Sequence, residues 1–204
     1  HSNTSDGSTT FVDSSATGRT ITAVGTAHHE SDQYKFGGTS MHFDGNSDYL
    51  TIASTSDFQF GTGDFTVDWW MNPTTVSGTY LGLISITSST TGKRIESALQ
   101  GSNIQIYTDT SAWRDTGFSP TVGQWTHIAL VRNYSAGTLK LYANGVEKWS
   151  VSNTRDYDEN ATGNIGQMSN YYNGYMDEIR ISKGIARWTE PFSPPSSPYP
   201  TFST

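Results

Sequence analysis

Residues 139–151, LKLYANGVEKWSV, carry the local pattern that decides the fold class. Apolar and polar residues alternate on both sides of Asn144 and Gly145, the preferred central pair of a two-residue type I′ turn, because both positions need a positive φ. The segment therefore predicts a β-hairpin. The same alternation occurs at 64–73, DFTVDWWMNP, and at 125–133, WTHIALVRN, as well as in most other patterned segments. We expect roughly a dozen short strands, which favours an all-β fold, a two-sheet antiparallel β-sandwich of the jelly-roll type.

The composition excludes several classes of function. The chain of 204 residues has a formal net charge of −7 and no cluster of lysine and arginine, so we expect no nucleic-acid partner. It has no apolar run near the roughly 20 residues of a membrane helix, so we expect no membrane insertion. It contains no cysteine, which excludes disulfides, thiol catalysis and thiolate zinc sites.

The distribution of prolines and aromatic residues predicts three segments. Residues 1–10 are a polar lead-in without the features of a signal peptide, and residues 11–183 carry the strand pattern of one β-sandwich domain. Residues 184–204 are rich in proline and aromatic residues, so we expect a tail in extended conformation that packs on the domain or leads to a neighbour.

Five stretches in order resemble the laminin-G-like, concanavalin-A-like lectin/glucanase domains, over roughly residues 8–195. They are KFGGTSMHFDGNSDYLTI, DFQFGTGDFTVDWWMNP, GQWTHIALVRN, GTLKLYANGV and YYNGYMDEIRISKGIARWTEPFSPP. The resemblance implies a LamG-type jelly roll, often with one structural calcium ion. It also implies a carbohydrate-binding or adhesion module of a larger microbial or phage protein, located outside the cell, on its surface or on a virion.

Asp177 is the residue whose role most needs an explanation. It shares one face of a predicted strand with Tyr175, Ile179 and Ile181, where an uncompensated carboxylate is costly. The pattern alone leaves open a catalytic acid, a metal ligand or a hydrogen-bonded structural residue. The resemblance implies that Asp177 binds calcium.

The other calcium ligands also come from the resemblance, which implies oxygens near Gly38 and Asp13. Ca²⁺ takes six to eight oxygen ligands, and backbone carbonyls serve as well as carboxylates. The alternative is that the Asp177 carboxylate accepts hydrogen bonds from nearby backbone N–H groups or pairs with an arginine.

The sequence favours a protein that is not an enzyme. Retaining glycosidases of the related fold carry an E-x-D-x-E run, in which carboxylates lie on one face of a strand. Glu30 and Asp32 match its first two places, but Tyr34 occupies the third. Asp177 and Glu178 are adjacent, so in a strand they point to opposite faces. A glycoside hydrolase or polysaccharide lyase is the less favoured alternative.

Recognition of a glycan needs aromatic faces beside polar groups, because sugars present apolar C–H faces ringed by hydroxyls. We selected polar, turn-rich stretches in which a large aromatic residue has no periodic reason to be buried. These candidates are Trp113, Arg114, Asp115, Asp156, Tyr157, Asn170, Tyr171, Tyr172 and Asn173. The alternative is that they fold over the edge of the sandwich. Trp70 with Asp68 is a second possible platform, and core packing is the alternative there.

The sequence thus predicts a non-catalytic module that binds a polysaccharide or glycan, with the fold stabilised by one calcium ion. The alternative is a structural or protein-interaction module, such as a phage fibre or capsid decoration domain, whose partners are other domains or subunits of the same assembly.

Overall fold

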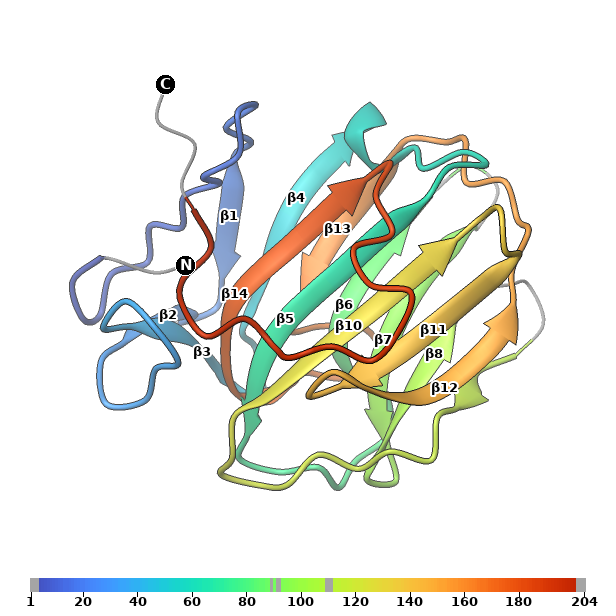
Figure 1. Ribbon diagram of the computed structural model, residues 1–204. Coiled ribbons are helices and arrows are strands. Elements are labelled where there is room, and N and C mark those ends of the chain that lie inside the picture. The colour runs from blue at the N-terminus through green and yellow to red at the C-terminus, as the bar shows by residue number, and fades with distance from the viewer. Residues whose placement is uncertain (1–3, 89, 91–92, 109–111, 201–204) are drawn as a thin grey trace.

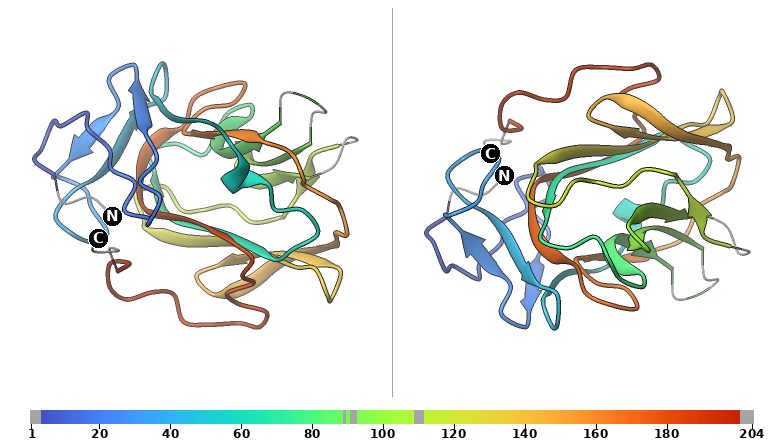
Figure 2. Two further views of the ribbon diagram at one scale, coloured as in Figure 1. Left: turned by 90° about the horizontal axis from the view of Figure 1, so that it is seen from above. Right: turned by 90° about the horizontal axis from the view of Figure 1, so that it is seen from below.

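The computed structural model describes residues 4–88, 90, 93–108 and 112–200, and it confirms an all-β sandwich. The described residues form two antiparallel sheets of seven strands each, stacked as two layers (Figures 1 and 2). The one helical element among them is the short 3₁₀ turn η1 (Ser56–Phe58).

The first sheet has the strand order β1-β4-β13-β6-β7-β8-β9. Its strands are β1 (Ile21–Val24), β4 (Tyr49–Thr55), β13 (Ala161–Ile165), β6 (Leu81–Thr87), β7 (Arg94–Gln100), β8 (Asn103–Tyr107) and β9 (Arg114–Asp115).

The second sheet has the order β12-β11-β10-β5-β14-β3-β2. Its strands are β12 (Val146–Ser152), β11 (Thr138–Ala143), β10 (Thr126–Asn133), β5 (Phe65–Pro73), β14 (Asn173–Lys183), β3 (Ser40–Asp44) and β2 (His28–Glu30). The predicted hairpin is β11–β12, and its turn has φ values of 48° at Asn144 and 76° at Gly145.

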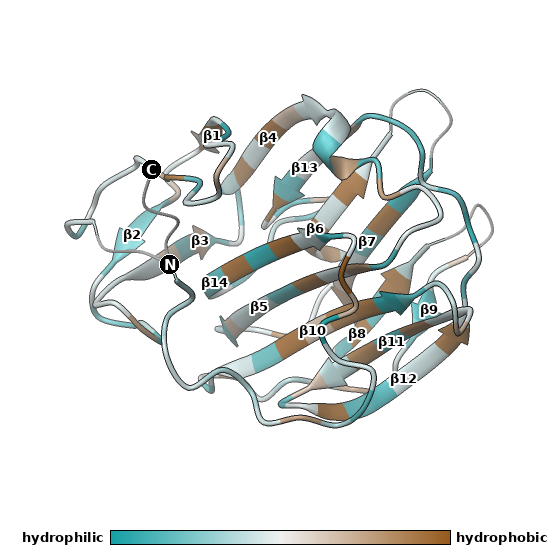
Figure 3. Ribbon diagram, turned by 45° about the horizontal axis from the view of Figure 1, so that its top comes forward, coloured by the Kyte–Doolittle hydropathy of each residue, from teal (hydrophilic) through white to brown (hydrophobic). Residues whose placement is uncertain are grey.

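The core lies between the sheets, because every second residue of the central strands points inward. Along β5 the inward residues include Val67, Trp69 and Met71, each at most 1% exposed. Figure 3 shows the resulting bands of apolar and polar residues along β5, β10 and β14. These inward side chains join the core residues of the first sheet in one apolar cluster.

The outward face of β5 is also buried, which strand alternation does not predict. Residues 184–200, which we call the C-terminal strap, cross the outer face of the second sheet (Figure 1). Trp188 and Phe192 stack on each other with ring centroids 4.0 Å apart and pack on Ala129, Val131 and Tyr142. The strap therefore shields the outer face of β5, β10 and β11.

A buried ionic cluster fastens the strap and includes Asp68, which is 0% exposed. Arg180 donates two hydrogen bonds to the Asp68 carboxylate, at 3.0 and 2.9 Å, and the Tyr199 hydroxyl donates to the same group. The Arg180 guanidinium also lies 3.8 Å from the centroid of the Tyr199 ring. Asp68 thus links β5 to both β14 and the end of the strap.

Candidate functional site

The outer face of the first sheet carries a row of polar side chains that runs across five strands. Strand pairing places Thr51, Asn164, Ser85, Glu96 and Tyr107 side by side in this order, from β4 to β8. Their neighbours along each strand are core residues, so alternation turns this row away from the core. The row contains hydroxyl, amide and carboxylate groups and ends at an aromatic ring. Thr51 and Asn164 are partly exposed, whereas Ser85, Glu96 and Tyr107 are 6–8% exposed.

Three aromatic side chains gather at that end of the row, and we call them the aromatic cluster: Tyr80, Tyr107 and Trp113. The Trp113 ring lies 4.8 Å from the Tyr80 ring, at an interplanar angle of 31°, and 5.5 Å from the Tyr107 ring, at 66°. Tyr80 and Trp113 are partly exposed. Tyr107 is 6% exposed, so Tyr80 and Trp113 supply the accessible apolar surface, and rings fixed in this way do so at little further cost in conformational entropy.

Charged groups border the cluster. The Arg94 guanidinium lies 4.1 Å from the centroid of the Tyr107 ring, and one of its nitrogens lies 3.6 Å from Glu96 Oε2. The other Glu96 oxygen accepts hydrogen bonds from the hydroxyls of Ser85, at 3.3 Å, and Thr87, at 3.1 Å. Burial raises the pKa of Glu96 above its ordinary value, against the opposing effect of Arg94. This arrangement can donate to and accept from the hydroxyls of a bound molecule.

Neighbouring loops hold the aromatic cluster in place. Tyr80 adopts a positive φ of 48°, and its backbone N–H donates to Gln100 Oε1 at 2.9 Å. Asn170 donates through its side chain to the Thr79 carbonyl at 2.6 Å and through its backbone N–H to the Tyr80 carbonyl at 3.2 Å. Asn170 therefore belongs to the site as a support for Tyr80.

Of the predicted ligand residues, Trp113, Arg114 and Asp115 lie at the aromatic cluster or beside it in β9. Arg114 and Asp115 are exposed, and Asp115 accepts hydrogen bonds from the Asn103 side chain at 3.1 Å and from the Gly117 N–H at 2.8 Å.

Tyr171 lies at the other side of the same sheet, with its ring 6.3 Å from that of Tyr49. Both rings are partly exposed. Tyr49 is in β4 and Tyr107 is in β8, four strand positions away. At a spacing of about 4.8 Å between strands, β4 and β8 are about 19 Å apart across the sheet.

The remaining predicted ligand residues lie elsewhere. Tyr172 is 0% and Tyr157 4% exposed, so both rings belong to the core and offer no platform to a ligand. Tyr157 donates its hydroxyl to the Thr108 carbonyl at 2.7 Å. Asp156 is exposed in the loop before Tyr157, and Asn173 begins β14 in the second sheet, where it pairs with Asp44. Neither is part of the row described above.

The second predicted platform, Trp70 with Asp68, is closed. Trp70 is 5% exposed, because Phe36 packs against its ring edge-on and the Lys35 ammonium lies 4.0 Å from the ring centroid. Asp68 lies in the ionic cluster beneath the strap. Both residues therefore have a packing role.

The sequence did not single out Tyr80, Arg94, Glu96 and Tyr107. The alternation in 94–100 and 103–107 places Glu96 and Tyr107 on the face of their strands that points away from the core. This pattern could have identified both as candidates for the outer face. The register of β7 and β8, which joins them, depends on contacts that no local pattern encodes.

Asp177 is 0% exposed, and its carboxylate accepts backbone N–H groups. Lys35 and Phe36 donate to Oδ2 at 3.1 and 3.0 Å, and Glu178 donates to Oδ1 at 2.9 Å. Burial nevertheless raises the pKa of Asp177 to about 6, because desolvation of the charge outweighs these hydrogen bonds. A carboxylate in this condition would be stabilised by a bound cation.

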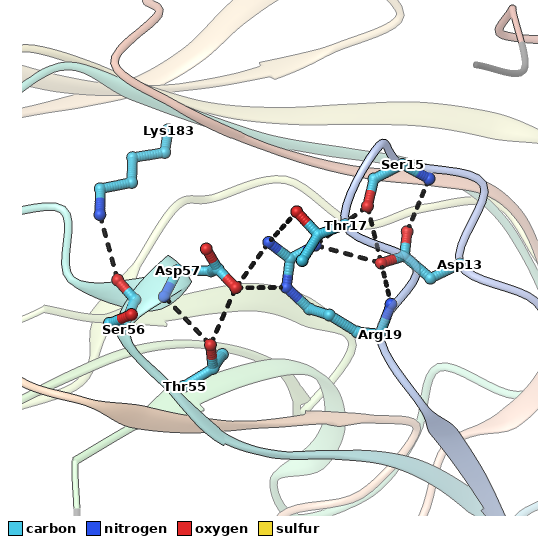
Figure 4. A network of polar contacts seen from close by, with 8 residues as sticks. All are labelled: Asp13, Ser15, Thr17, Arg19, Thr55, Ser56, Asp57 and Lys183. Carbon is cyan, nitrogen blue, oxygen red and sulfur yellow. Dashed lines mark hydrogen bonds and ion pairs between the residues drawn. The ribbon is translucent and has the colours of Figure 1, made fainter. Parts of the chain in front are cut away.

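The two other predicted calcium ligands differ in their surroundings. The Asp13 carboxylate accepts from the backbone and hydroxyl of Ser15, at 2.9 and 2.8 Å, and pairs with the Arg19 guanidinium at 3.1 Å (Figure 4). Arg19 supplies the positive charge for this carboxylate, whereas the calcium ligand that the resemblance implies here is a backbone carbonyl at or near Asp13. Gly38, with a φ of 93°, lies in the loop before β3 that also supplies the Lys35 and Phe36 N–H groups.

Within the part of the chain that the structure describes, no three His, Asp or Glu side chains gather as a metal-binding group. A calcium site at Asp177 would thus depend on backbone carbonyls for most of its ligands.

Comparison with known proteins decides the family. Residues 44–190 match the family model of the concanavalin A-like lectin/glucanases superfamily. The chain belongs to this superfamily. The laminin-G-like resemblance seen in the sequence is thereby confirmed. No curated protein sequence matches the chain.

Solved structures of this superfamily's fold include several binding domains. Domain 4 of AbnA, a GH43 extracellular arabinanase from Geobacillus stearothermophilus, was solved in complex with arabinotriose; it is 26% identical, has a TM-score of 0.63, and 82% of each chain is covered. A structure of botulinum neurotoxin type C is 12% identical to this chain, with a TM-score of 0.64. Cell entry of that toxin depends on interaction with two ganglioside molecules. The alignment covers 85% of this chain and 45% of the toxin chain, so this likeness concerns the fold alone.

The described residues include no helix that is long and apolar enough to span a membrane.

Proposed function

We propose that this domain is a non-catalytic carbohydrate-binding module that binds a glycan on the outer face of its first sheet. The observation that carries the proposal is the aromatic cluster of Tyr80, Tyr107 and Trp113 at the end of a row of hydroxyl, amide and carboxylate groups. Such a pairing suits sugars, which need ring stacking and hydrogen bonds at the same time.

Two considerations support a short oligosaccharide as the ligand. Domain 4 of AbnA, at 26% identity, binds arabinotriose. The separation of about 19 Å between β4 and β8, which carry Tyr49 and Tyr107, corresponds to several linked sugar units across the strands. We therefore expect a neutral, arabinose-containing oligosaccharide to cover the polar row, with one end stacked on the aromatic cluster and longer chains reaching Tyr171.

Calorimetric titration with arabinotriose and longer arabinan oligosaccharides tests the proposal. Trp113→Ala should weaken binding by about tenfold or more, which corresponds to about 1.4 kcal/mol. Tyr34→Ala is the matched control, because Tyr34 is 50% exposed and lies outside the first sheet. Equal affinities of the two variants would place the glycan elsewhere.

The same experiment separates the alternative function. If the protein binds no oligosaccharide in the titrations or on a glycan array, yet assembles with itself or with a partner protein in ultracentrifugation, it is a structural or adhesion module. New reducing ends on incubation with arabinan would contradict the non-catalytic part of the proposal. An extracellular, cell-surface or virion location belongs to the same proposal.

We also propose one structural calcium ion bound by Asp177 with backbone carbonyls, the Gly38 carbonyl among them. The support is the buried Asp177 carboxylate, whose raised pKa a divalent cation would lower. On protein that contains calcium by elemental analysis, EDTA should lower the melting temperature of the wild type and leave Asp177→Asn unaffected. An unchanged wild-type melting curve in EDTA would exclude the ion.

A further inference from the structure

A cleft of about 500 Å³ opens between the two sheets, away from the glycan face. Its walls include Ile21 of β1, Ile52 of β4, Phe58 of η1, and Ile179 and Ile181 of β14. This volume falls within the range of roughly 300–1,000 Å³ that is usual for small-molecule sites. The cleft is therefore large enough for a ligand and is lined by side chains from both sheets.

The walls of this cleft remain partly open to solvent. Ile21, Ile52, Ile179 and Ile181 are all only partly buried, although they pack against the main core cluster. Most of the core residues between the central strands are instead at most 5% exposed. The sandwich thus leaves apolar surface uncovered at this edge, and an apolar occupant would be favoured there by about 25 cal/mol for each Å² that it covers.

The polar network on one side of the cleft is already satisfied. Arg19 pairs with Asp13 at 3.1 Å and with Asp57 at 2.7 Å, and the Lys183 ammonium donates to the Ser56 carbonyl at 3.1 Å (Figure 4). This network joins the 13–19 loop to η1 and to the end of β14. It fixes the rim of the cleft and has no need of a further partner.

Arg187 differs from these rim residues. The cleft and a second, open pocket of about 430 Å³, lined mainly by the strap itself, share Arg180, Ile185, Arg187, Tyr199 and Pro200. Arg180 is matched by Asp68, whereas the Arg187 side chain donates to the Ser182 hydroxyl at 2.8 Å. Among the described residues no carboxylate lies within 4.0 Å of the Arg187 guanidinium, so this cation has no ionic partner at the end of the apolar cleft.

We propose that the cleft between β1, β4 and β14 binds a single-chain aliphatic carboxylate, with its chain among the isoleucines and its carboxylate paired with Arg187. The apolar walls select the chain, and the planar guanidinium can form two parallel hydrogen bonds to a carboxylate. Two nearby arginines disfavour a cationic head group, and a neutral head group would leave Arg187 without an ionic partner.

Calorimetric titration of the full chain with hexanoate, octanoate and decanoate, below their micelle concentrations, tests the proposal. Each methylene buried contributes about 0.8 kcal/mol, so two more should tighten binding by up to about 15-fold. Decanol and decyltrimethylammonium should bind at least about tenfold more weakly than decanoate, because only the carboxylate pairs with Arg187. Affinity that is independent of chain length would overturn the proposal.

Two variants locate the site. Arg187→Gln should weaken decanoate binding and leave decanol binding unchanged, because it removes the ionic partner of the carboxylate and keeps the isoleucine walls that bind the chain. Lys140→Gln is the matched control, because Lys140 is a surface cation on β11 paired with Glu147 at 2.9 Å. If both variants weaken decanoate binding equally, the loss comes from the removal of one positive charge from the surface, and the proposed pairing with Arg187 is wrong. Arabinotriose binding should stay unchanged in both, so failure of one proposal leaves the other intact.

Discussion

Replacement of Arg180 by methionine should destabilise the domain more than the loss of any surface ion pair. The change keeps the aliphatic part of the side chain and removes both hydrogen bonds to Asp68, at 3.0 and 2.9 Å. The Asp68 side chain is 0% exposed, so its charge would stay buried without its main partner.

The expected loss of unfolding free energy follows from how deeply the Arg180–Asp68 pair is buried. Removing one partner of a fully buried ion pair costs about 3–5 kcal/mol. Here the Arg180 side chain is 22% exposed, and the Tyr199 hydroxyl still donates to Asp68. We therefore expect a loss of about 2–4 kcal/mol, which for a domain of this size lowers the melting temperature by about 4–16 °C.

Equilibrium unfolding in urea, followed by tryptophan fluorescence, measures the loss. Lys140→Met is the control, because the Lys140–Glu147 pair lies on the surface, where such pairs contribute about 1 kcal/mol or less. Asp68→Asn combined with Arg180→Met should recover part of the loss, since the uncompensated charge is then gone. If Arg180→Met costs no more than Lys140→Met, or the double variant recovers nothing, the buried pair does not stabilise the strap as described.

Three further predictions rest on single features. Because burial raises the pKa of Asp177 from 3.8 to about 6, the calcium-free folded state binds a proton more readily than the unfolded state, and the free energy of unfolding should fall as pH rises through this interval. Asp177→Asn should flatten that slope in urea titrations at pH 4–7, and a slope kept by the variant would assign it to another group. Gly117→Ala should cost about 1 kcal/mol of stability, and Gly145→Ala should cost clearly more. Both glycines have a positive φ, but only a Cβ at Gly145 would meet the strap backbone, at 1.7 Å. Equal shifts in melting temperature would contradict this contact. Tyr172→Ala should cost about 3–5 kcal/mol and Tyr171→Ala less than about 1 kcal/mol, because only the first ring is fully buried, and similar unfolding midpoints would show that the two rings are equally exposed.

Local pattern was sufficient for the architecture. The Asn144-Gly145 pair fixes a hairpin through backbone preference alone, and strand alternation separates core from surface wherever one face is free. Alternation failed at Asp68 and Trp70, whose outward positions are covered by the strap and by the loop before β3. Such burial comes from segments distant in sequence, which no periodicity reports.

The candidate site, too, could be predicted only in part from local sequence. Trp113, Arg114 and Asp115 are neighbours in sequence, and a polar stretch with one large aromatic residue was enough to select them. Tyr80 and Tyr107 join Trp113 only through the pairing of β6 to β9, in which a bulge between Gly82 and Ile84 shifts the register. Tyr172 was selected by the same criterion as Trp113, yet its ring packs edge-on against Phe43 in the core. Composition of a loop does not reveal which of its rings turns inward.

The strap also explains why the two sheets have different roles. On the second sheet, the outward side chains of Asp68 and His127 are 0% exposed because the strap lies over them. On the first sheet, the outward side chains of Thr87, Arg94 and Asn164 keep their exposure. Ser85 and Glu96 of the polar row are only 6% and 8% exposed, so a ligand on the first sheet would meet the row mainly through its partly exposed members, whereas substitutions beneath the strap act on stability. Binding and stability should then separate by sheet: variants beneath the strap lower the free energy of unfolding without changing glycan affinity, because the core between the sheets keeps the polar row in register.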